Sequence, residues 1–114
     1  MYRKLAIVGT LGLSFFAMPA WAESYPNRTI TIITPFPPGS TSDVIPRLLT
    51  PLLSKSLGAN VIVENRPGAN GSLGAAKVAS APADGYTLLM ATTGVLAINP
   101  WVYAKLPYSP ARDF

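Results

Sequence analysis

Apolar, β-branched runs alternate with helical repeats along most of the chain. Residues 30–34 (Ile-Thr-Ile-Ile-Thr) are such a run and predict a strand. Apolar residues then recur at helical spacing, which predicts a helix over 43–57 that stops at Gly58. Pro51 falls inside this helix, so we expect a bend or an irregular turn near Thr50.

The pattern repeats twice more. A nearly continuous apolar run at 60–64 is typical of a buried parallel strand. An Ala-rich segment predicts a helix over 72–80, and a third run predicts a strand over 86–91. The inward positions of the 72–80 helix are expected to be Leu73, Ala76 and either Val78 or Ala79.

The resulting order of elements is β-α-β-α-β-α. Strands separated by helices pair in parallel through right-handed crossovers, so the fold class is α/β with a parallel sheet. Asn99-Pro100 and Ser109-Pro110 each place a capping residue before proline, and each predicts the start of a short helix.

Three loops follow the predicted strands, at 35–43, 65–72 and 92–94. In parallel sheets ligands bind beyond the carboxyl ends of the strands, where these loops lie. The first loop offers a flexible Gly39, three hydroxyls and the N-terminus of a helix, which suits an anion. The alternative is a capped loop without a ligand, because Ser, Thr and Asp are ordinary N-caps. Asp43 would repel an anion, so we expect it to cap the helix.

The first 22 residues have the layout of a secretory signal peptide. A basic start precedes a charge-free apolar run over 5–18, and small residues stand at Ala20 and Ala22. We therefore expect cleavage after Ala22 and export. The alternative is a membrane-tethered interaction protein that keeps residues 1–22, although the apolar run is shorter than the ~20 residues of a spanning helix.

Charge and residue types exclude several functions. Residues 23–114 carry seven Lys and Arg against five Asp and Glu, a mild excess that gives no reason to expect nucleic acid as a partner. The chain has no His and no Cys, so a nucleophile lacks its usual base and metal ligands are few. No phosphate-binding loop pattern is present. We expect no enzyme activity, no metal and no cofactor.

Two motifs in the chain are specific: Glu-Asn-Arg-Pro-Gly-Ala at 64–69 and Asp-Gly-Tyr-Thr at 84–87. They are accompanied by Tyr25-Pro26, Pro35-Phe36-Pro37-Pro38-Gly39 through Asp43, Ile98-Asn99-Pro100, Leu106-Pro107-Tyr108 and Asp113-Phe114. Together these motifs resemble one family, the periplasmic substrate-binding proteins of tripartite tricarboxylate transporters, also called the Bug family.

The resemblance implies a periplasmic-binding-protein-like fold with two lobes and a small carboxylate between them. It implies that the first two strand-exit loops hold the carboxylate through backbone N–H groups, hydroxyls and bridging waters. The third loop is a weaker candidate. The candidate ligand-binding residues are Pro38, Gly39, Ser40, Thr41, Ser42 and Asp43; Pro67, Gly68, Ala69, Asn70, Gly71 and Ser72; and Thr92 and Thr93. Arg66 is expected to pair with Glu64 or Asp84 instead of the ligand.

The resemblance also implies partners and an organisation. Its members deliver a small organic acid to membrane permease subunits in the periplasm, and we expect a monomer. Ser40 departs from the family, which usually has a second glycine there, so its Cβ narrows the site or its hydroxyl adds a contact. Relatives are longer and have a second lobe. We therefore expect residues 23–114 to be a partial, truncated N-terminal lobe, whose one-sided site weakens or abolishes binding.

Overall fold

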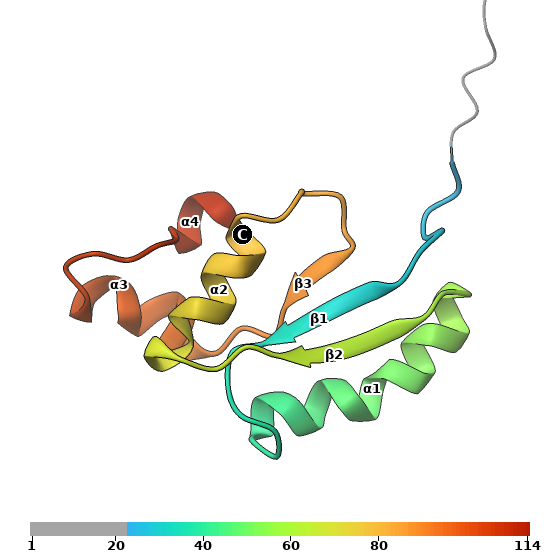
Figure 1. The fold of residues 1–114 in the computed structure, drawn as a ribbon, viewed down its shortest axis with the longest axis horizontal. Helices are drawn as coiled ribbons and strands as arrows, with labels where there is room; N and C mark the ends of the chain where they lie inside the picture. The colour runs from blue at the N-terminus through green and yellow to red at the C-terminus, as the bar shows by residue number, and fades with distance from the viewer. Residues whose placement is uncertain (1–22) are drawn as a thin grey trace, which may run out of the picture.

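The computed structural model describes residues 23–114, so the predicted signal peptide lies outside the described residues. The chain forms a small α/β unit (Figure 1). Its elements are β1 (Ile30–Thr34), α1 (Thr41–Leu57), β2 (Val61–Asn65), the 3₁₀ turn η1 (Ala69–Gly71), α2 (Ser72–Ala79), β3 (Thr87–Leu89), the π-helical turn η2 (Gly94–Ile98), α3 (Asn99–Val102) and α4 (Pro110–Asp113).

All three strands form one parallel sheet in the order β2-β1-β3. β1 is the central strand and has the predicted bounds, because its β-branched residues are buried on both faces. The last residues of β1 and β2 lie side by side, with Thr34 opposite Asn65. The predicted fold class and the parallel pairing are confirmed.

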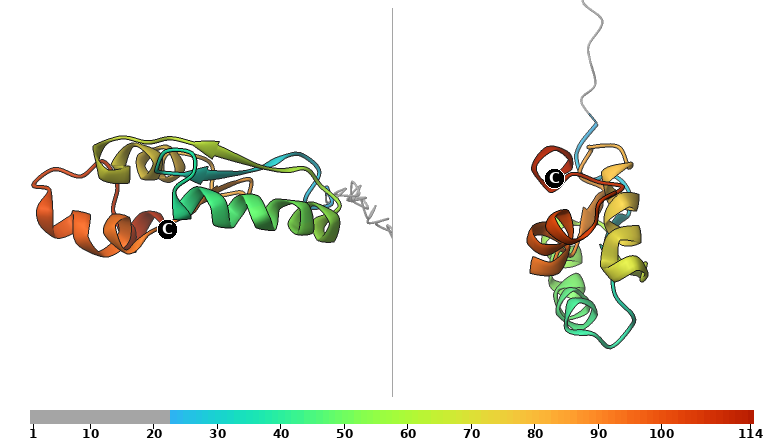
Figure 2. Two further views of the ribbon diagram at one scale, coloured as in Figure 1. Left: turned by 90° about the horizontal axis from the view of Figure 1, so that it is seen from below. Right: turned by 90° about the vertical axis from the view of Figure 1, so that its left-hand side faces the viewer.

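α1 and α2 cover opposite faces of the sheet (Figure 2). On the face under α1, Leu53 packs against a core of Ile30, Ile32 and Val61. On the other face a second core joins Ala75 of α2 to Val95 and Tyr108, which both lie in the segment after β3. The segment after β3 therefore packs against α2.

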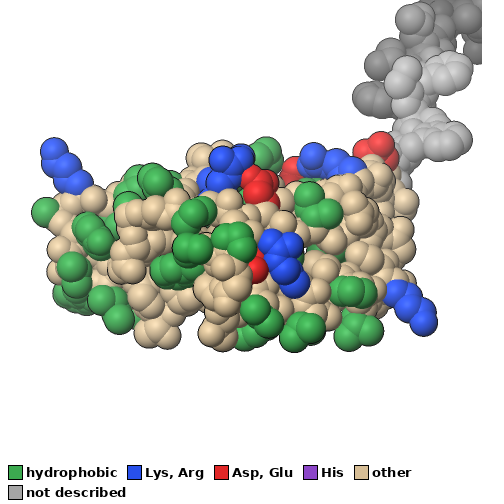
Figure 3. Space-filling model, turned by 60° about the horizontal axis from the view of Figure 1, so that its bottom comes forward, with side chains coloured by type: hydrophobic (Ala, Val, Ile, Leu, Met, Phe, Trp, Pro, Cys, Tyr) green, Lys and Arg blue, Asp and Glu red, His purple; other side chains and the backbone are tan. Residues whose placement is uncertain are grey.

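α1 begins at Thr41, two residues earlier than predicted, with Ser40 at the N-cap. It ends as predicted, at a left-handed Gly58. Three of its leucines, Leu48, Leu49 and Leu52, form a stripe that faces solvent, where Leu48 is 70% and Leu52 67% exposed. Figure 3 shows hydrophobic side chains gathered on this surface. The described sheet is too narrow to cover the stripe, because α1 lies along its edge strand β2.

The expectation near Thr50 was a bend or an irregular turn, and the irregular turn does not form, because α1 is helical from Thr41 to Leu57. Pro51 has no N–H to give to the carbonyl of Arg47, four residues earlier. The Thr50 hydroxyl donates to that carbonyl at 3.0 Å. The side chain of Thr50 thus replaces the missing backbone donor.

Thr50→Val tests this compensation. Loss of the hydroxyl leaves the Arg47 carbonyl without its donor, so we expect the free energy of unfolding to fall by about 0.5–1 kcal/mol. In a Pro51→Ala background the backbone at position 51 regains its N–H and supplies the bond, and the same substitution should cost almost nothing. Urea unfolding of the four chains measures the difference, and equal costs in both backgrounds would contradict the compensation.

Two predictions about β2 and α2 were wrong. β2 spans 61–65 and is an edge strand with only Val61 buried, because β1 takes the central position. In α2, Leu73 points outward and Gly74 and Ala75 are buried, although Ala79 packs on the second core as predicted. A Cβ at position 74 would lie 2.9 Å from the Cα of Pro35, so glycine lets α2 approach the end of β1.

The end of the chain differs in part from the prediction. β3 spans only Thr87–Leu89. Ser109-Pro110 opens α4 and Asn99-Pro100 opens α3, as predicted, but Asn99 is not the N-cap of α3, because η2 leads directly into that helix. Among residues 23–114, every helix is too short or too polar to traverse a bilayer.

Candidate functional site

The three strand-exit loops begin at the same edge of the sheet. Parallel pairing places Thr34 beside Asn65, and Ile33 beside Leu89. The loops that follow these strands therefore leave from one end of the molecule (Figure 1). This arrangement is the one that the order of elements predicts.

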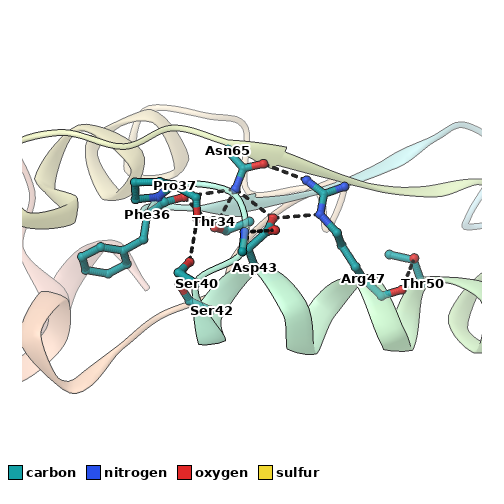
Figure 4. A network of polar contacts seen from close by, with 10 residues as sticks. Thr34, Phe36, Pro37, Ser40, Ser42, Asp43, Arg47, Thr50 and Asn65 are labelled. Carbon is teal, nitrogen blue, oxygen red and sulfur yellow. Dashed lines mark hydrogen bonds and ion pairs between the residues drawn. The ribbon is translucent and has the colours of Figure 1, made fainter.

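The side chain of Asn65 ties the first two exits together (Figure 4). Its amide nitrogen Nδ2 donates to the carbonyl of Phe36 at 3.1 Å and to Oδ1 of Asp43 at 2.8 Å. Its oxygen accepts from Nη2 of Arg47 at 2.7 Å. Asn65 thus links the end of β2 to the loop after β1 and to the first turn of α1.

Asp43 is buried, and its carboxylate is saturated by donors from this chain. Oδ2 accepts the N–H of Gly39 at 2.9 Å, and Oδ1 accepts from Nε of Arg47 at 2.9 Å as well as from Asn65. Asp43 is therefore not the N-cap. It lies in the first turn of α1, and its side chain reaches back to the N–H of Gly39, the residue before the N-cap.

The same contacts shift the ionisation of Asp43. The N–H of Gly39, and then Asn65 and Arg47, hold the pKa of Asp43 below its ordinary value, although burial opposes them. The negative charge is thus compensated inside the protein. This reduces the repulsion that an anion bound outside the loop would meet.

Acid should destabilise the protein partly through Asp43. A pKa lowered by folding gives stability that is complete above the unfolded value of about 3.9 and is lost as the pH falls through the folded value. We expect the urea midpoint to fall below about pH 5. Asp43→Asn should be less stable at pH 7 and show a flatter decline with acid.

A matched variant separates Asp43 from the other shifted carboxyl. The pKa of Asp113 is also lowered, chiefly by Arg112. Asp113→Asn should therefore remove the contribution of Asp113 to the fall of the urea midpoint in acid and keep the contribution of Asp43. Identical pH profiles for the wild type and Asp43→Asn would contradict the assignment.

Ser40 uses its polar groups within the first loop. Its hydroxyl donates to the carbonyl of Pro37 at 2.8 Å, and its N–H donates to the same carbonyl at 3.2 Å. The hydroxyl of Ser42 lies 3.2 Å from that of Ser40. Ser40 thus stiffens the loop by its own hydrogen bonds.

The second loop has an unusual backbone. Gly68, Ala69, Asn70 and Gly71 all have positive φ, at 130°, 47°, 50° and 83°. This turn places Gly71 against the second core, where a Cβ would lie 2.7 Å from Cγ2 of Val95. Gly71 and Ser72 are buried, whereas Gly68, Ala69 and Asn70 are exposed.

The main-chain N–H groups of the two loops fall into two classes. Those of Gly39, Ser40, Gly71 and Ser72 are bound within the chain. Within residues 23–114, no acceptor is present for those of Thr41, Ser42, Gly68, Ala69 and Asn70. The free groups lie at the start of α1 and on the exposed turn, where an anion is favoured.

Comparison with known proteins places this geometry in a family. Residues 45–114 match the tripartite tricarboxylate transporter family receptor. The chain belongs to this receptor family. BugT of Bordetella pertussis is 41% identical over 115 residues, which cover 99% of this chain and 35% of BugT.

Solved structures of related proteins share the fold. MatC (Rpa3494) from Rhodopseudomonas palustris, with bound malate, has a TM-score of 0.75 at 39% identity over 79% of this chain and 31% of MatC. R. palustris Rpa4515, with adipate, has a TM-score of 0.74 at 40% identity over 77% and 29%. The chain thus spans about a third of the length of such receptor-family proteins.

Two cavities lie away from the strand exits. One of about 360 Å³ lies between α2, β3 and Phe114, and one of about 300 Å³ lies near Arg28 and Asn60, at the opposite end of the sheet.

The candidates of the third loop, Thr92 and Thr93, lie at the start of a helical run. Oγ1 of Thr92 accepts the N–H of Val95 at 3.4 Å, and Thr93 is exposed. Arg66 pairs with Glu64 as expected. Sequence reasoning missed Asn65, Asn99 and Tyr108, although all three lie in the motifs shared with the receptor family.

Proposed function

We propose that this chain supplies the carboxylate-binding edge of a periplasmic solute receptor of the tripartite tricarboxylate transporter type. Residues 23–114 would form part of its first lobe, after cleavage at Ala22. The observation that carries the proposal is the pair of loops with free N–H groups at one edge of the sheet. Charge-assisted bonds from backbone N–H groups bind a carboxylate without an arginine partner.

The loops divide into contact and support residues in this proposal. The free N–H groups of Thr41, Ser42, Gly68, Ala69 and Asn70 would hold the carboxylate. Asp43, Gly71 and Ser72 would shape the loops from inside. The remaining candidates, Pro38, Gly39, Ser40, Pro67, Thr92 and Thr93, would border the site.

The ligand class is a small di-acid, and the downstream partners are membrane permease subunits. Support comes from family membership and from relatives whose structures contain malate and adipate. The mild charge of residues 23–114 and the absence of His and Cys are consistent with reversible binding and no chemical step.

Titration calorimetry with malate and adipate on the full chain tests the proposal. Malamide is the matched control, because it has the size of malate without its charges. We expect heat of binding with the di-acids and none with malamide. Equal binding of malate and malamide, or no binding of either di-acid at millimolar concentration, would overturn the proposal.

A further inference from the structure

The exposed turn of the second loop needs support. Ala69 and Asn70 both adopt left-handed backbone conformations, at φ 47° and 50°, which cost energy for residues other than glycine. Asn tolerates this conformation better than most residues, but its exposed side chain gains little from burial. A contact from another segment must therefore hold the turn.

That contact comes from Asn99, which is fully buried. Its Oδ1 accepts from Nδ2 of Asn70 at 2.9 Å, and its Nδ2 donates to the main-chain carbonyl of Asn70 at 3.0 Å. The two residues are 29 positions apart in the sequence. Asn99 thus binds both the side chain and the backbone of the left-handed residue.

Tyr108 holds Asn99 in turn. In the π-helical turn, the N–H of Asn99 bonds to the carbonyl of Gly94, five residues earlier. The next donor in that register would be residue 100, a proline without an N–H, so the carbonyl of Val95 has no backbone donor. The Tyr108 hydroxyl donates to this carbonyl at 2.6 Å and lies 3.3 Å from Nδ2 of Asn99.

We propose that Asn99 and Tyr108 form a clasp that fixes Asn70 in its left-handed conformation, which makes Asn99 a positioning residue for the carboxylate site. The clasp aims the free N–H groups of residues 68–70 outward. This rests on the proposed function. The clasp also gives a role to two motifs, Ile98-Asn99-Pro100 and Leu106-Pro107-Tyr108. Both lie outside the three strand-exit loops and contain none of the candidate ligand-binding residues.

Asn99→Ala in the full chain tests the clasp. Malate binding should weaken about tenfold, because the turn must then be ordered when the ligand binds. Val61→Ala is the matched control, since it opens the core under α1 on the other face of the sheet. At temperatures where both variants remain folded, the control should bind within about twofold of the wild type.

Rescue separates positioning from general stability. Glycine adopts the left-handed conformation without help, so Asn70→Gly should make malate binding insensitive to Asn99→Ala. An equal loss of binding in both backgrounds would overturn the clasp, as would unchanged binding in Asn99→Ala alone.

A ligand-free readout keeps the test independent of the proposed function. The ¹⁵N heteronuclear NOE of the amides of residues 68–71 should fall in Asn99→Ala and stay unchanged in Val61→Ala. If wild-type chain bound no di-acid, the proposed function would fail, and this NOE would decide the clasp alone. Equal NOE values in the two variants would overturn it.

Discussion

Gly71→Ala is expected to lower the free energy of unfolding by about 2–4 kcal/mol, one of the two largest effects in this protein. Two costs add. At φ 83° a Cβ is strained, and the new methyl would lie 2.7 Å from Cγ2 of Val95 and 3.2 Å from Cβ of Pro35. Val95 is fully buried in the second core, and closely packed cores resist such displacements.

Gly39→Ala is the matched control for this effect. Gly39 has nearly the same φ, 84°, but its Cβ would meet nothing within 4 Å. It should therefore cost only the strain, about 1–2 kcal/mol. Urea unfolding of both variants gives the comparison. Equal costs would show that Gly71 is required only for its conformation and that the second loop does not pack on Val95.

Ile33→Ala should destabilise the protein by about 2–5 kcal/mol, because it removes a fully buried side chain from the central strand. Small domains have little stability in reserve, so this variant can be largely unfolded at 25 °C. Ile33→Val offers a graded measurement at about 0.5–1.5 kcal/mol. Loss of β1 would separate the two exits that it positions.

Ile62 is the control on the neighbouring edge strand. Its side chain is 42% exposed, so Ile62→Ala should cost about 1 kcal/mol or less. Thermal unfolding followed by circular dichroism ranks the variants. A cost for Ile62→Ala equal to that for Ile33→Ala would contradict the order β2-β1-β3 and would make β2 the buried strand that its apolar run predicts.

The elements that sequence predicted best are those governed by local rules. β1 has the predicted bounds because its β-branched residues pair on both sides, and α1 ends at Gly58 because a left-handed cap suits glycine. The parallel order followed from the alternation of strands and helices. The edge that carries the loops followed from that order, so the location of the candidate site was predictable.

The errors arise where distant residues decide the outcome. Leu73 was predicted to face inward, but close packing of Gly74 on Pro35 turns α2 the other way. The continuous course of α1 past Pro51 depends on one hydroxyl. Asn99 contacts Asn70, which is 29 positions away in the sequence, and Tyr108 supports Asn99. Only their place in two motifs without an assigned function indicated that these residues support the second loop.

Thr41 offers the most direct test of the central claim, that free backbone N–H groups bind the carboxylate. Thr41 is the first residue of α1, where proline is well tolerated, and Ser40 before it already has the extended conformation that a following proline requires, at φ −70° and ψ 159°. Thr41→Pro therefore deletes one free N–H and leaves the helix intact. Thr41→Ala removes the hydroxyl and keeps the N–H.

The decisive measurement is the Kd of malate for these two variants by titration calorimetry. One charge-assisted hydrogen bond is worth about 1.5–3 kcal/mol, so Thr41→Pro should bind malate roughly 10–100-fold more weakly than Thr41→Ala, with unchanged stability. Equal affinity of the two variants for malate would contradict a carboxylate site built from the backbone N–H groups of these loops.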